Sequence, residues 1–192
     1  SIIDSEYKHF YLELNICSEK HQLEFIENLI NLKKEKESLF DKPDYLDCSI
    51  IKTLKDIWDN PSYVENNSPN KDQSHKEIIM TIILKYIEHS LAKEDKKYFD
   101  EKDLIISGHG INGCLALIFC LDKDIHTLFC ESGISFKTKN VITYGMPPFM
   151  SKNFFTKTRE EDTPSSPNHL LELNNIRLFQ FSLPTDWLSF FT

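Results

Sequence analysis

Glycine is scarce in this sequence: five of the 192 residues are glycine, and three of the five are Gly108, Gly110 and Gly113. Glycine is favoured where the backbone takes a positive φ or where two backbones approach closely, because it has no Cβ. The clustering of these glycines in the stretch LIISGHGINGC (104–114) therefore predicts an unusual backbone conformation there.

A surplus of positive charge is absent as well. The chain carries 22 Lys and Arg against 30 Asp and Glu, a formal net charge of −8. Binding to a nucleic-acid backbone rests on clustered Lys and Arg, so this balance argues against nucleic acid as a partner. No apolar run of about 18 or more residues occurs, so no transmembrane segment is predicted. The first residues do not resemble a signal peptide, and the chain opens on Ser1 rather than Met, which suggests a processed form or a fragment.

The five cysteines include no CxxC pair. They are Cys17, Cys48, Cys114, Cys120 and Cys130. Three of them stand in strongly apolar stretches, where a free thiol behaves as a small hydrophobe. An odd count without metal-site spacing fits a reducing compartment better than a disulfide framework. An intracellular location is thus favoured, and no metal site is predicted.

What the chain does contain is the apolar content of a folded protein, with 40% hydrophobic and 12% aromatic residues. We expect one domain over residues 1–192. Alternation and aromatic content predict strands, and helical spacing of apolar residues predicts helices. The expected strands are 8–17, 103–107, 140–145 and 176–183, and the expected helices are 19–40, 48–58, 75–93, 111–122 and 149–158. Alternating strands and helices predict an α/β fold, a mainly parallel sheet with helices on both faces.

The glycine stretch matches two unrelated patterns. One is GxGxxG, which after a strand and before a helix holds a pyrophosphate at the helix N-terminus. An acidic residue about 20 positions later then binds the ribose, and Glu131 fits if HTLFCE (126–131) is the next strand. This stretch resembles the flavin-binding segment of flavoprotein oxidoreductases and would imply FAD or NAD. Against it, about 100 mostly helical residues precede the motif and only about 60 follow Glu131, too few for the rest of such an enzyme.

The other pattern is the nucleophile elbow GxSxG, a sharp strand-to-helix turn flanked by small residues. The segment LIISGHGINGCLALIFCLD resembles the GHSLGG elbow of the class 3 (fungal-type) lipase family, with Gly108, His109, Gly113 and Ala116 in matching places. In this resemblance Gly110 takes the place of the nucleophilic serine.

Three further segments resemble the same family, in family order. FYLELNICSEKHQLEFIENL is similar to the strand, oxyanion turn and lid, with Ser18 near the oxyanion residue. VITYGMPPFMSKNFF is similar to the segment vyTFGsPRVGnkaF, and IRLFQFSLPTDWLSFF to the strand before the triad acid, which puts Asp186 at that acid. The resemblance spans nearly all of the chain and implies an α/β-hydrolase-like fold that is C-terminally short.

The departures from the family pattern bear on chemistry. The family mechanism needs a Ser nucleophile, a His, an Asp and N–H donors for the oxyanion, one of them on the residue after the nucleophile, here Ile111. Gly110 cannot form an acyl-enzyme. Asn112 replaces a further motif glycine, so its side chain is expected where helix and strand are closest. The family's His lies downstream of the acid, whereas His169 precedes Asp186.

Other nucleophiles fit the sequence less well, because Ser107 precedes the turn, Cys114 suits packing and Ser18 suits a helix cap. The leading hypothesis is a lipase-like pseudoenzyme without a cofactor, which binds an acyl lipid or a protein partner beneath a lid at about residues 18–30. Two alternatives stay open. One is an FAD- or NAD-binding module, and the other is an ester hydrolase with a non-standard nucleophile or a His in a C-terminal extension.

Overall fold

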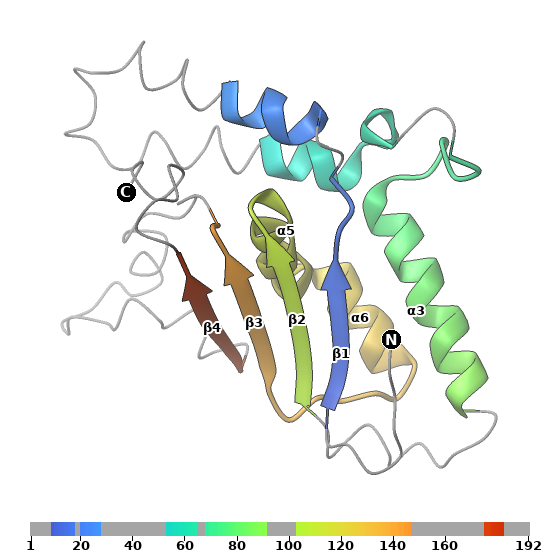
Figure 1. Cartoon of the computed structure of the whole chain (residues 1–192). Coiled ribbons are helices and arrows are strands. Elements are labelled where there is room, and N and C mark those ends of the chain that lie inside the picture. Colours follow the sequence, from blue (N-terminus) through green and yellow to red (C-terminus); the bar gives the residue numbers. More distant parts are fainter. Residues whose placement is uncertain are drawn as a thin grey trace, which may run out of the picture.

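The computed structural model describes residues 9–17, 20–27, 53–64, 68–91, 103–146 and 175–182. Figure 1 shows these residues as a sheet flanked by helices. The strands are β1 (His9–Leu14), β2 (Asp103–His109), β3 (Lys139–Tyr144) and β4 (Ile176–Phe181). The helices are η1, a 3-10 turn (Pro61–Tyr63), α3 (His75–Leu91), α5 (Ile111–Leu121) and α6 (Lys123–Glu131). Residues 20–27 and 53–59 are also helical.

The four strands form one parallel sheet in the order β1-β2-β3-β4. In its register Leu14 stands beside Gly108, and Gly108 stands beside Thr143. The carboxyl ends of the strands therefore meet at one edge of the sheet, the upper edge in Figure 1. The glycine stretch lies at this edge, where ligands bind in open parallel sheets. The predicted α/β class with a parallel sheet is confirmed.

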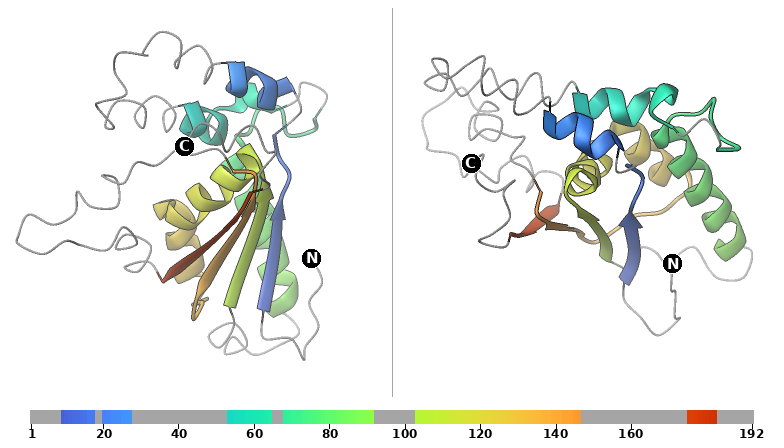
Figure 2. Two further views of the ribbon diagram at one scale, coloured as in Figure 1. Left: turned by 60° about the vertical axis from the view of Figure 1, so that its left-hand side comes forward. Right: turned by 45° about the horizontal axis from the view of Figure 1, so that its top comes forward.

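Helices α3, α5 and α6 lie on one face of the sheet (Figure 2), and the helices over 20–27 and 53–59 lie beyond the carboxyl ends of the strands (Figure 1). Helix α5 packs against β2 and β3, and α6 follows it on the same side. Helix α3 lies beside β1, where the ring of Tyr86 meets Phe10 edge-on at 5.5 Å. Phe10 is buried on this face, whereas Tyr11 points to the other and is 42% exposed. Helices on both faces were expected; within the described residues this holds for one face, and the second face stays a prediction.

A chain of aromatic rings forms the centre of the core between sheet and helices. The rings are successive neighbours: Trp58–Phe119 (6.3 Å), Phe119–Phe129 (6.4 Å), Phe129–Phe136 (5.1 Å) and Phe136–Phe10 (6.0 Å). Such inclined or edge-to-face pairs each add about 0.5–1.5 kcal/mol beyond the burial of their area. This chain of rings links the helix over 53–59 to α5, α6 and β1.

The carboxylate of Asp122 makes hydrogen bonds or an ion pair with three helices. Asp122 caps α6, because its Oδ1 accepts the N–H groups of Asp124 (2.8 Å) and Ile125 (3.3 Å). Its Oδ2 accepts Trp58 Nε1 at 2.9 Å and lies 3.0 Å from Lys76 Nζ on α3. Burial alone would raise the pKa of Asp122, but the hydrogen bonds outweigh it and the pKa is lowered.

The elements largely follow the sequence-based expectations. Strands 8–17, 103–107, 140–145 and 176–183 and helices 75–93 and 111–122 are confirmed, each to within a few residues. The helices expected at 19–40 and 48–58 are confirmed over 20–27 and 53–58, and the one expected at 149–158 lies outside the described residues. The alternative strand at 126–131 is wrong, because this segment belongs to α6. Asp122 starts that helix, and Ile125 and Phe129 are buried one turn apart.

None of the described helices combines the length and the apolar character that crossing a membrane requires.

Replacing Asp122 with Ala is expected to lower the free energy of unfolding by about 2–4 kcal/mol, because α6 loses its cap, the buried Nε1 of Trp58 loses its acceptor and Lys76 loses one of its ion pairs. Urea unfolding followed by circular dichroism measures this. Asp72→Ala is the control; Asp72 is exposed in a turn, and its loss should cost less than about 0.5 kcal/mol.

The stabilising contribution of Asp122 is also expected to depend on pH. A lowered folded-state pKa means that the contribution of Asp122 is complete above its unfolded value of about 4 and is lost as the pH falls through the folded value. The stability difference between wild type and Asp122→Ala should shrink below about pH 4. A difference that grows in acid would contradict this assignment.

Candidate functional site at the strand–helix turn

The chain passes from β2 into α5 through a single residue, Gly110. Its backbone has φ 55° and ψ −124°, a combination that side-chain-bearing residues adopt only at a cost of about 1–3 kcal/mol. Its N–H donates to the carbonyl of Tyr144 on β3 (2.8 Å), and its carbonyl accepts the N–H of Gly113 (3.0 Å). The unusual backbone conformation expected for this stretch is confirmed.

The flanking glycines allow the backbones of β2 and α5 to touch. A Cβ on Gly108 would lie 2.3 Å from the carbonyl oxygen of Asn112 and 2.7 Å from the nitrogen of Gly113, both backbone atoms of the helix. A Cβ on Gly113 would lie 3.1 Å from Cβ of Thr143 and 3.3 Å from Cβ of Met146. Any side chain at Gly108 therefore forces the helix away from the strand.

Asn112 links the start of α5 to the residues that follow β1. Its side chain is buried, at 3% exposure, and its Oδ1 accepts the N–H groups of Ile16 (3.1 Å) and Cys17 (3.0 Å). We expected this side chain where helix and strand are closest. That expectation is wrong: the backbone of Asn112 makes the close approach to Gly108, and its side chain points to the segment that follows β1.

Gln22, on the helix over 20–27, lies over the turn. Its Nε2 donates to the carbonyl of Cys17 at 3.2 Å. Its Oε1 lies 3.8 Å from the point where a Cβ on Gly110 would stand, and no other described atom outside the adjoining residues comes within 4 Å of that point. The described group nearest to a small side chain at Gly110 would therefore be the Gln22 amide, which cannot act as a general base.

The imidazoles of His21 and His75 make their contacts away from Gly110. The ring of His21 packs edge-on against Tyr63 at 5.3 Å, and His75 is buried at the start of α3. Burial lowers the pKa of His75, with a further lowering by His21 against a raising hydrogen bond at the Tyr63 backbone. His109 ends β2 and is exposed. Neither His21 nor His75 is within 4 Å of the Cβ position at Gly110.

The thiols of Cys17 and Cys114 and the hydroxyl of Ser107, all near the turn, are buried. Burial raises the pKa of Cys17 to about 12 and that of Cys114 well above its ordinary value, so both stay protonated thiols. Ser107 is buried, with its Oγ 2.6 Å from the hydroxyl of Tyr11. These residues support the fold around the turn, in line with the packing role expected for Cys114.

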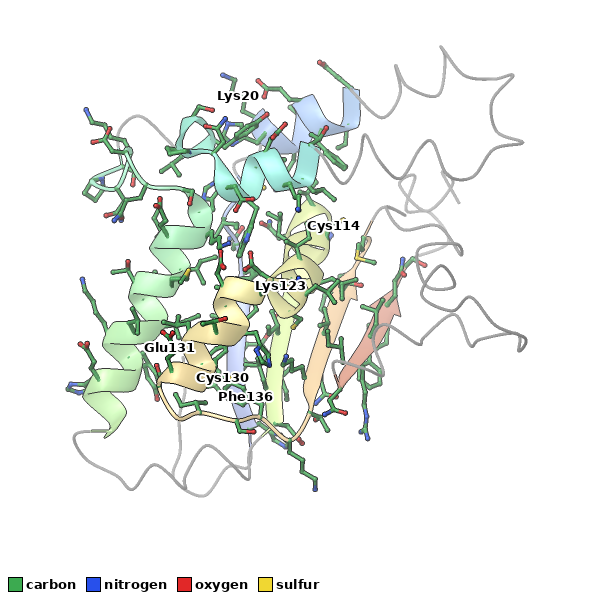
Figure 3. All side chains as sticks on the ribbon, turned by 180° about the vertical axis from the view of Figure 1, so that it is seen from behind. Lys20, Cys114, Lys123, Cys130, Glu131 and Phe136 are labelled. Carbon is green, nitrogen blue, oxygen red and sulfur yellow. The ribbon has the colours of Figure 1, made fainter. Side chains whose placement is uncertain are left out.

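The structure brings together most of the residues singled out from the sequence. Those at the turn are Gly108, His109, Gly110, Ile111, Asn112 and Gly113. Glu131 instead ends α6, and Figure 3 labels it far from Cys114, which lies in the first turns of α5. Ser18 and Asp186 lie outside the described residues. The bonds of Asn112 were missed, although a lone polar residue in an apolar helix signals a buried partner.

Comparisons with protein-family models, curated proteins and solved structures find no match to this chain. Within the described ranges, no three His, Cys, Asp or Glu side chains are grouped as a metal ion requires.

Asn112→Ala is expected to leave two buried N–H groups without their acceptor, which costs about 2–4 kcal/mol of stability. Amide hydrogen exchange measures the effect at the two sites directly. Exchange at Ile16 and Cys17 should accelerate far more than exchange at Ile106, at the centre of β2. An even acceleration along the chain would instead indicate global destabilisation without a local bond to Asn112.

Proposed function

We propose that this chain is a class 3 lipase-like α/β-hydrolase domain that has lost ester hydrolysis and binds an acyl lipid or a protein partner. The observation that carries the proposal is the geometry of Gly110, which sits alone between β2 and α5 at φ 55° and ψ −124°. A hydrolase elbow imposes a sharp, strained turn of this kind on its nucleophile. Here the turn is kept, and the residue on it has no side chain to attack an ester.

The surroundings of the turn support the same proposal. In α/β-hydrolases the oxyanion is held by the N–H after the nucleophile and by an N–H from the loop that follows a neighbouring strand. The corresponding groups are the N–H of Ile111 and those that follow β1, at Ile16 and Cys17. The carbonyl oxygen of the Asn112 side chain already accepts the latter two. An ester carbonyl at the turn would compete with a bound amide oxygen, so a second part of the mechanism is compromised.

The helix over 20–27 supports a binding role. Phe25 anchors it in the core at 2% exposure, whereas Leu23 is 55% exposed. The resemblance puts this helix in the lid, and Gln22 holds it over Gly110. An exposed leucine on such a helix offers an apolar contact for an acyl chain or for a partner surface.

The alternatives receive less support. For FAD or NAD on Gly108, Gly110 and Gly113, the acidic ribose ligand should end the next strand, but Glu131 ends helix α6. For an active ester hydrolase, Cys114 is a buried thiol with a raised pKa and Ser107 is paired with Tyr11. A flavin absorbance spectrum in the purified protein would favour the first alternative.

Incubation with a fluorophosphonate probe tests the loss of chemistry. We expect the intact-protein mass to stay unchanged, because losing the nucleophile of a triad enzyme lowers kcat by about 10⁶. An active serine hydrolase treated in parallel verifies the probe. A stoichiometric adduct would overturn the proposal, and peptide mapping would locate the real nucleophile.

Binding of a fluorescent fatty acid tests the lipid-binding role. Leu23→Glu is expected to weaken binding by about tenfold or more, because a charge replaces an apolar contact on the lid helix. The matched control is Ile82→Glu, since Ile82 is similarly exposed, at 58%, but on α3. Equal losses in both variants, or binding that neither variant changes, would argue against a lid-bound acyl chain and leave a protein partner.

A further inference from the structure

Helix α6 carries a thiol and an imidazole on neighbouring turns. Sγ of Cys130 lies 3.6 Å from Nδ1 and 4.0 Å from Nε2 of His126, four residues earlier. Both side chains are exposed, so reagents in solution can reach them. An imidazole at this distance accepts the proton of a thiol or stabilises its thiolate. Figure 3 shows Cys130 far from Cys114, so this pair takes no part in the turn at Gly110.

Cys130 differs from the other cysteines that the structure describes. Cys17, Cys114 and Cys120 are buried, and burial raises the pKa of Cys17 and Cys120 to about 12. Such thiols are inert, because the thiolate is the nucleophile and reagents have no access. Cys130 alone in this set is exposed and has a base beside it.

A cleft of about 220 Å³ opens beside the pair. Cys130, His126 and Lys139 line it, with the rings of Phe129 and Phe136 as apolar walls. Lys139, at the start of β3, is partly buried, and no carboxylate of the described segments forms an ion pair with it. A small molecule that enters this cleft therefore meets a nucleophile, a base, a cation and an apolar surface. The pair is less suited to binding a metal ion, because no third ligand is grouped with it among the described residues.

We propose that Cys130 is a thiol-modification site that exchanges with small disulfides carrying carboxylates, with His126 as its base and Lys139 as the contact for the carboxylate. The thiol proton of Cys130 passes to the imidazole, and Sγ attacks one sulfur of the disulfide. The disulfide bond breaks as the new bond to Sγ forms, and the other half leaves as a thiolate that takes a proton. Cys130 is thereby oxidised to a mixed disulfide, and the released half is reduced to a thiol.

Two aromatic disulfides of different charge test the proposal on the full chain carrying Cys48→Ser, which removes the thiol outside the described segments. One is 5,5′-dithiobis(2-nitrobenzoate), which bears two carboxylates, and the other is uncharged 4,4′-dithiodipyridine. With both, we expect the native protein to be modified at Cys130, as peptide mapping will identify. His126→Gln should slow both reactions by about tenfold or more, because the base is lost.

Lys139→Gln should slow only the carboxylate-bearing disulfide, by about three- to tenfold, since the cation attracts only that probe. Lys137→Gln is the matched control, because Lys137 is exposed two residues away and outside the cleft. The Lys137→Gln variant should react with both probes at the same rates as the Cys48→Ser parent protein. Full reactivity in His126→Gln, or equal slowing of both probes in Lys139→Gln, would overturn the proposal. Circular dichroism of each variant verifies that it is folded.

Discussion

The structure depends on one contact between backbones, where β2 and α5 touch at Gly108. The carbonyl of Asn112 and the nitrogen of Gly113 occupy the space that any Cβ on Gly108 would need. Because the helix lies this close, Gly110 must turn the chain in one residue, and Thr143 and Met146 must pack directly beneath Gly113. The position of α5 then sets the position of α6, which follows it after Asp122. The few glycines of the chain are thus concentrated where close packing requires them.

The fold was largely predictable from local patterns. Strand β2 and helix α5 are nearly continuous apolar runs on either side of a glycine turn, so their type and order follow from periodicity and turn chemistry. The segment 126–131 was ambiguous, since a short apolar run fits a strand or a helix. Asp122, which caps the helix three residues before the buried Ile125, is the local signal for a helix that the strand interpretation left out.

The details of the candidate site were less predictable, because they depend on partners far away in the sequence. The glycine turn was recognisable from its residues, but nothing local indicates that the Asn112 side chain bonds to Ile16 and Cys17, nearly a hundred residues earlier. The same holds for Gln22 over Gly110 and for Trp58 and Lys76 at Asp122. Sequence patterns report which residues need a buried partner; the packing of whole elements decides which partner they meet.

The register of the sheet also sets the order in which it can assemble. His9 pairs with Asp103, so β1 can pair with β2 only after all of the intervening chain has been synthesised. Closing so long a loop costs entropy before the ladder of hydrogen bonds repays it, and folds dominated by such distant pairings form slowly. On the ribosome β1 emerges well before β2 and has no strand to pair with. The interval between the two is when an unpaired, aromatic-rich edge is open to association with other chains.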